Sequence, residues 1–90
     1  MAAVILIVKI MPDSPLTDLE EIKASAETAM KAEGAQAVTF EEKPIAFGLK
    51  AVYMKFSLPE EKGTDIVEAK LSAIKNVSSV TIEDYRRAFG

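Results

Sequence analysis

Carboxylates are the first side chains to consider for acid–base chemistry in this chain, because its 90 residues include neither histidine nor cysteine. Among them are two adjacent pairs, Glu41-Glu42 and Glu60-Glu61. Neighbouring residues on a strand point to opposite faces of a sheet, so such pairs are typical of solvated charge rather than of a catalytic dyad. The commonest general base, zinc ligand and thiol nucleophile are all missing. We therefore expect a protein that is not an enzyme, carries out no covalent chemistry, and binds no cofactor or metal.

Phosphate-binding and nucleic-acid-binding patterns are also missing. Gly48 and Gly63 stand alone, with neither a P-loop sequence nor Gly-x-Gly-x-x-Gly around them, so we expect the chain to bind no nucleotide by itself. The formal net charge of −3 opposes direct nucleic-acid binding, which depends on clustered Lys and Arg. An RNA-binding domain would need aromatic side chains together on its central strands, whereas Tyr53 and Phe56 belong to opposite faces. An RNA-binding domain stays as an alternative, although the acidic net charge predicts that RNA does not bind.

The segment 44–50 is an unusually apolar connection, with Phe47 beside a glycine just before a further apolar strand. Turns in small soluble proteins normally use Asn, Asp, Ser and Gly. Ile-Ala-Phe in such a place is either packed into the core or offered to a partner, and the residues alone leave both open. A second unexplained feature is the pair Arg86-Arg87, which is either a solubilising tail or a cation held close to the body of the domain.

The elements that must position these residues follow from the hydrophobic pattern. Strands are expected at 3–11, 35–43, 49–58 and 77–85, helices at 18–32 and 64–75, and a tail from residue 85 onward. The order β-α-β-β-α-β predicts an α+β, ferredoxin-like sandwich: a four-stranded antiparallel sheet with two helices on one face and the first and third strands central. Thr17-Asp18-Leu19-Glu20 has the form of a capping box, and Gly34 is placed to end the first helix in the left-handed conformation.

A chain of this length forms a single domain, residues 1–90. The apolar run at 1–8 is too short for a membrane span, so we expect a cytoplasmic protein with no membrane partner. The sheet face away from the helices would be either a docking surface or a partly covered sheet. Its expected residues are Ile5, Ile7, Lys9, Ala51, Tyr53, Lys55, Thr81 and Glu83. Self-association through that face, with Phe47 in the core, would make the chain a regulatory or oligomerisation module.

Four segments resemble translation elongation factor 1-beta, in its compact archaeal form without the amino-terminal extension and acidic linker of eukaryotic relatives. The sharpest is Pro44-Ile45-Ala46-Phe47-Gly48-Leu49-Lys50, which looks like that family's Ile-Gly/Ala-Phe-Gly-aliphatic-Lys signature. Residues 11–15, 63–65 and 77–87 extend the resemblance over essentially the whole chain. The resemblance implies a guanine-nucleotide exchange factor that promotes GDP release and GTP reloading on elongation factor 1-alpha. The nucleotide would then be bound by that GTPase alone.

The resemblance also implies which residues contact the GTPase. In the apolar loop, Phe47 would be the anchor, Gly48 would keep its neighbourhood free of bulk, and Lys50 would support the interface, with Ile45 and Ala46 beside them. Near the carboxyl end, a lysine of the eukaryotic relatives reaches toward the magnesium site of the GTPase. That position maps onto Arg87, with Arg86 beside it. Arginine is planar and larger than an ammonium group, so the exchange is not conservative at a tight site.

Overall fold

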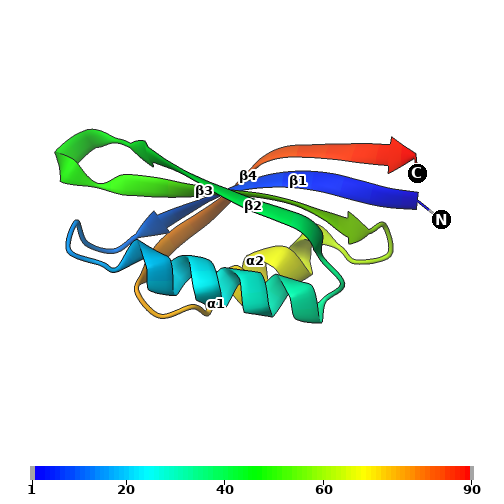
Figure 1. Ribbon diagram of the computed structural model, residues 1–90, viewed down its shortest axis with the longest axis horizontal. Coiled ribbons are helices and arrows are strands. Elements are labelled where there is room, and N and C mark those ends of the chain that lie inside the picture. The colour runs from blue at the N-terminus through cyan, green and yellow to red at the C-terminus, as the bar shows by residue number, and fades with distance from the viewer. Residues whose placement is uncertain (1, 90) are drawn as a thin grey trace.

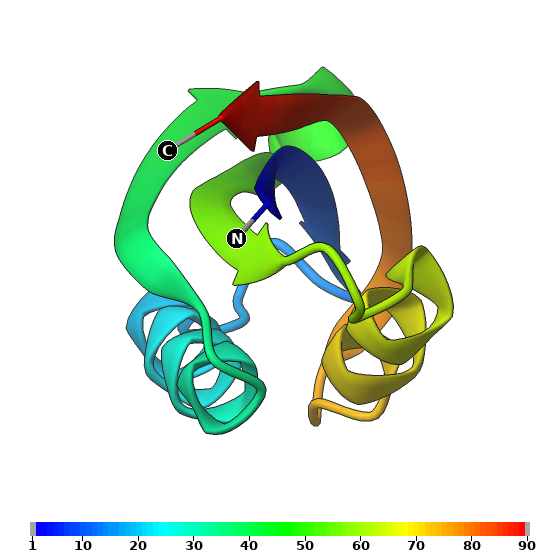
Figure 2. The same cartoon turned by 90° about the vertical axis from the view of Figure 1, so that its right-hand side faces the viewer.

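The computed structural model describes residues 2–89, and the side chains of residues 3–87. The strands are β1 (Ala2–Pro12), β2 (Gln36–Pro44), β3 (Lys50–Pro59) and β4 (Val77–Phe89) (Figure 1). The helices are α1 (Leu19–Ala32), α2 (Thr64–Ser72) and the short 3-10 turn η1 (Ala46–Gly48). The strands form one antiparallel sheet in the order β2-β3-β1-β4, with both α-helices on the same side of it (Figure 2). The ferredoxin-like prediction, with the first and third strands central, is confirmed.

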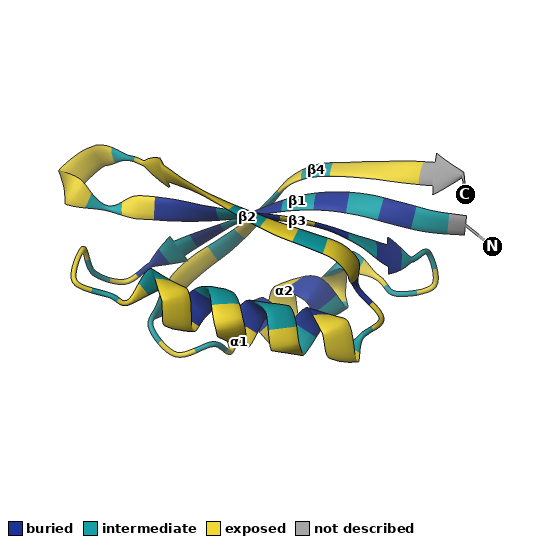
Figure 3. Ribbon diagram, viewed as in Figure 1, coloured by how far each residue is buried: buried dark blue, intermediate teal, exposed yellow. Residues whose placement is uncertain are grey.

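The core lies between the sheet and the helices because the central strands alternate strictly between two faces. Their buried residues are Val4, Leu6, Val8 and Ile10 from β1 and Val52, Met54, Phe56 and Leu58 from β3 (Figure 3). On α1, Ile22, Ala26 and Met30 recur every four positions and form one apolar stripe against this layer, and α2 adds Val67 and Leu71. Each large side chain so buried contributes about 1.5–3 kcal/mol of transfer free energy.

The start of α1 differs from the capping box predicted from the sequence. The N-cap is Asp18, whose carboxylate accepts a hydrogen bond from the backbone N–H of Glu20 at 3.0 Å. The hydroxyl of Thr17 donates instead to the carboxylate of Asp13, also at 3.0 Å. Aspartate caps at least as well as threonine, and the side chain of Thr17 is already engaged. The end of the helix is as predicted, since Gly34 has a left-handed φ of +96°.

The expected tail is wrong for the residues that the structure describes. Arg86 and Arg87 lie within β4, which continues to Phe89 and pairs with the first half of β1. Pairing along the whole edge of β1 satisfies backbone N–H and C=O groups that a free tail would leave to water.

The sheet face away from the helices is partly covered, which is one of the two alternatives that the sequence left open. The expected residues that are half-buried are Ile5, Ile7, Lys9 and Tyr53, and those that are exposed are Lys55, Thr81 and Glu83. Ala51 is fully buried, which corrects its placement on an open surface. The ammonium of Lys43 lies 4.6 Å from the centroid of the Tyr53 ring and covers part of the apolar centre.

Candidate functional site

The apolar loop forms the tip of the hairpin that joins β2 to β3. The backbone N–H of Ile45 donates to the carbonyl of Leu49 at 2.8 Å, and the N–H of Leu49 donates to the carbonyl of Ala46 at 3.3 Å. Between them, η1 places Phe47 at φ 64° and Gly48 at φ 75°, both left-handed. Glycine adopts this conformation freely, whereas for a residue with a Cβ it costs about 1–2 kcal/mol. The tip is therefore held in one shape at some expense in backbone strain.

That shape turns the phenylalanine ring outward. Phe47 is 92% exposed, so the alternative that placed it in the core is wrong. Gly48 and Ala46 are also exposed, and Ile45 is half-buried at the base of the loop. A benzyl group that is 92% exposed on a strained backbone has little contact within its own molecule, and such features concentrate at binding surfaces.

Charged side chains brace the base of the same hairpin. The ammonium of Lys23 on α1 lies 2.5 Å from the carboxylate of Glu42 on β2 and 2.9 Å from that of Glu20. The hydrogen bond from Lys23 lowers the pKa of the Glu42 carboxyl, and the charge of Lys50 adds a smaller effect in the same direction. Hydrogen bonds to Glu42 and then to Glu20 raise the pKa of Lys23. Lys50, at the start of β3, is exposed beside this ion pair.

The two arginines of β4 point to opposite sides of the sheet. Arg87 is opposite the core residue Val4, whereas Arg86 is opposite Ile5, whose side chain lies on the other face. Arg87 donates to the carboxylate of Glu60, which follows β3, and Arg86 bonds Asp84 at 2.9 Å. Both guanidinium groups are exposed and each has an acidic partner. A single cation site made of both residues is therefore excluded by the strand geometry.

The structure does not bring the predicted residues together. The hairpin tip lies at one end of the long axis and the end of β4 at the other (Figure 1), in a molecule whose extents are 42 × 20 × 19 Å. We call residues 45–50 the tip patch, and Arg86 with Arg87 the arginine patch. The two patches can contact one partner together only if that partner extends along the domain.

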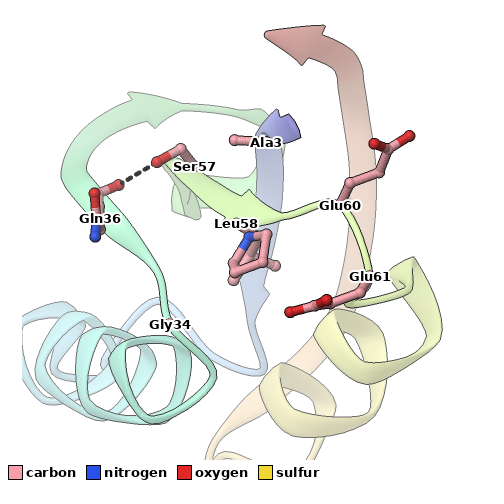
Figure 4. Close-up of a pocket in the computed structure, with 8 residues that line it drawn as sticks. Ala3, Gly34, Gln36, Ser57, Leu58, Glu60 and Glu61 are labelled. Atoms are coloured by element: carbon pink, nitrogen blue, oxygen red, sulfur yellow. Dashed lines mark hydrogen bonds between the residues drawn. The ribbon is translucent and has the colours of Figure 1, made fainter. Parts of the chain in front are cut away.

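A hollow of about 620 Å³ lies at the arginine end and was not found by sequence reasoning. Its walls come from the starts of β1 and β2, the end of β3 and the adjoining turns. The lining residues are Ala3, Gly34, Gln36, Ser57, Leu58, Pro59, Glu60 and Glu61. Figure 4 shows Glu60 directed toward β4 and Glu61 toward the hollow. The hydroxyl of Ser57 donates to the carbonyl of Gln36 at 3.3 Å across one wall. Each of these residues is ordinary in its local sequence, so no pattern marks the hollow.

Two further observations concern metals and membranes. Within residues 2–89, the structure contains no cluster of three or more His, Cys, Asp or Glu side chains that could hold a metal ion. Among the same residues, no helix combines the length and apolar composition needed to cross a bilayer.

Comparison with known proteins places this geometry in context. Residues 5–88 match the family model described as the EF-1 guanine nucleotide exchange domain. The chain is 44% identical to elongation factor 1-beta of Methanobrevibacter smithii over 88 residues, which cover 97% of this chain and 98% of that protein. It is 41% identical to elongation factor 1-beta of Methanocella arvoryzae over 90 residues, covering 99% of this chain and 100% of that protein.

The fold is also found among solved structures. One example is LarC2, the C-terminal domain of a cyclometallase involved in the synthesis of the NPN cofactor of lactate racemase, in its apo form. The TM-score is 0.66, with 12% sequence identity over 99% of this chain and 58% of that one. At that identity the likeness shows a shared fold and nothing about activity.

Proposed function

This chain belongs to the family of EF-1 guanine nucleotide exchange domains, and on that premise we propose that residues 1–90 act as one exchange domain for elongation factor 1-alpha. The domain promotes GDP release from that GTPase and so allows GTP to reload. One observation carries the proposal: Phe47 is fixed in a left-handed backbone with 92% of its surface in water, at the tip of a hairpin that the rest of the fold supports.

In this proposal the tip patch is the anchor. Interface free energy concentrates in a few large side chains that become fully desolvated, and aromatic residues are prominent among them. Phe47 enters the partner already held in position, so little conformational freedom is lost on binding. Gly48 adds no side chain next to the anchor, and apart from its two chain neighbours no heavy atom lies within 4 Å of where its Cβ would be. Lys50 stands next to the anchor as an exposed cation.

The arginine patch takes the second role, at the other end of the domain. The phosphates of GDP in a GTPase are held by a P-loop and Mg²⁺. A cation that approaches this site competes with the metal or displaces its ligands, which weakens GDP. Of the two arginines we assign this role to Arg87, because it projects toward the helix side together with Glu60. Its ion pair with Glu60 must open first, and the cost is small because exposed pairs contribute about 0–1 kcal/mol.

Exchange of this kind works by binding alone. The chain forms no covalent bond with nucleotide, contacts neither nucleic acid nor membrane, and acts in the cytoplasm. Coupling between two ligands of one protein is reciprocal, so the factor by which this domain weakens GDP equals the factor by which GDP weakens the domain. Each tenfold acceleration of GDP release requires about 1.4 kcal/mol off its barrier.

Reciprocity gives the experiment. We expect titration calorimetry to show that the chain binds nucleotide-free archaeal elongation factor 1-alpha at least about tenfold more tightly than the same GTPase saturated with GDP and Mg²⁺. A ligand that merely docks on the GTPase would bind both forms equally. Equal dissociation constants would therefore rule out exchange while leaving binding intact.

A further inference from the structure

Two large apolar side chains stand almost completely in water at the same end of the molecule. Leu16, in the loop between β1 and α1, is 94% exposed, and Phe47 is 92% exposed. Among the described residues, the next large hydrophobic side chain in this class is Tyr85, at 46%. In Figure 1 the β1–α1 loop and the β2–β3 hairpin both project at the end opposite the carboxyl terminus. Single exposed leucines are common, whereas exposed apolar side chains that gather at one end of a molecule are typical of interaction surfaces.

The loop that carries Leu16 is as firmly shaped as the hairpin tip. The backbone N–H of Leu16 donates to the hydroxyl of Ser14 at 3.1 Å, and the N–H of Thr17 donates to the carbonyl of Ser14 at 3.2 Å. The N–H of Asp13 donates to the carbonyl of Asn76 at 2.9 Å, which ties the loop to the residue that precedes β4. Pro15 fixes the backbone just before the leucine. These contacts hold Leu16 outward, away from the core.

The two loops share one depression. A hollow of about 260 Å³ is lined by Pro15 and Thr17 from the first loop, Gly48 and Lys50 from the hairpin, and Asp18 at the start of α1. Leu16 and Phe47 are the immediate chain neighbours of lining residues on its two sides. Leu16 and Phe47 therefore flank a single polar depression. A partner protein that contacts one of these side chains is placed close to the other.

We propose that Leu16 is a second apolar contact to the same GTPase, so that elongation factor 1-alpha meets this end of the domain through Leu16 and Phe47 together. The inference rests on the proposed function, since the occupant is the partner that Phe47 anchors. We name the GTPase as the partner because the loop that carries Leu16 and the tip patch line the same hollow and so form one surface. Leu16 has almost no contact within its own domain to lose, so its burial in the complex adds to affinity nearly in full.

The test uses four full-length proteins: the wild type, Leu16→Ser, Leu16→Met and Phe47→Ala. Each is titrated into nucleotide-free archaeal elongation factor 1-alpha by calorimetry. We expect Leu16→Ser to raise the dissociation constant by about tenfold, because burial of a leucine side chain is lost. Leu16→Met keeps the apolar reach and should stay within about twofold of the wild type. Thermal unfolding of all four should coincide within a few degrees, since the exposed side chains support no core.

The outcomes separate this inference from the proposed function. A wild-type dissociation constant for Leu16→Ser, with weaker binding by Phe47→Ala, would overturn the role of Leu16 and leave the exchange proposal standing. Unchanged binding by both variants would overturn Leu16 and Phe47 alike as contacts to the GTPase. No binding by the wild type would overturn the proposed function together with this inference. Sedimentation of the chain alone gives a further check. If the wild type dimerises and Leu16→Ser does not, the occupant is a second copy of this chain, and the inference is wrong.

Discussion

Replacing Phe47 with alanine should slow exchange while leaving the fold intact. The ring is 92% exposed, so its removal deletes almost no contact within the domain. In the complex, full burial of a phenylalanine contributes about 1.5–3 kcal/mol, which corresponds to about 10- to 100-fold in the rate of factor-stimulated GDP release. The assay is stopped-flow release of fluorescent GDP from archaeal elongation factor 1-alpha, at a concentration of the factor below saturation.

The left-handed backbone at Phe47 supplies a matched control. At φ 64° both phenylalanine and alanine are strained, whereas glycine is not. Phe47→Gly should therefore remove the ring and relieve about 1 kcal/mol of strain, partly offset by the greater entropy of the unfolded chain. We expect its melting temperature to equal or exceed that of Phe47→Ala, while its exchange activity is equally low.

Two results would refute this reasoning. If Phe47→Ala and Phe47→Gly both release GDP at the wild-type rate, the ring takes no part in the mechanism. If the activity of both falls only in proportion to a loss of folded protein, seen by circular dichroism, Phe47 has a structural role. That result would contradict the inference from its exposure. Phe47→Leu keeps an apolar side chain of smaller size and should lie between alanine and the wild type.

Other substitutions test the remaining parts of the account. Glu60→Gln releases Arg87 from its ion pair and should speed GDP release by about two- to threefold, because exposed pairs contribute at most about 1 kcal/mol. Arg87→Ala should slow release, and an effect below about twofold would show that Arg87 does not act as the cation near the metal site. Gly48→Ala forces a Cβ into φ 75° and should lower the free energy of unfolding by about 1 kcal/mol in urea, where an unchanged midpoint would contradict the strain. The ion pair with Lys23 lowers the pKa of Glu42, so its stabilisation is present above the unfolded pKa and is lost as pH falls through the folded one. The melting temperature of Glu42→Gln should accordingly lie below that of the wild type at about pH 7 and meet it at about pH 2.5, and a gap that persists in acid would contradict this cause.

The fold could be predicted because its determinants are local and periodic. Alternation along β1 and β3 and the four-residue spacing of Ile22, Ala26 and Met30 select the core face of each element without any knowledge of its neighbours. The largest error arose where long-range pairing decides. Arg86 and Arg87 carry no strand signal of their own, and they lie in β4 because the first half of β1 offers them backbone partners.

The candidate site could be predicted only in part. Its chemistry was visible in an apolar loop that departs from ordinary turn composition, but composition does not say whether the hairpin reaches beyond the helices. The exposure of Phe47 depends on that length and on the left-handed backbone at the tip. The exposure of Leu16 could not be predicted, because a single leucine in a loop can equally well be packed or exposed. The opposite placement of the two patches follows from the strand order and the 42 Å length of the molecule.

The central claim is that this domain loosens GDP from its GTPase. Its most direct test is the dissociation of labelled GDP from archaeal elongation factor 1-alpha, chased with excess unlabelled GDP, with and without a substoichiometric amount of this chain. We expect release to accelerate at least about tenfold, with each molecule of the chain acting on many GTPase molecules. A release rate that does not depend on the chain at any concentration would contradict the account.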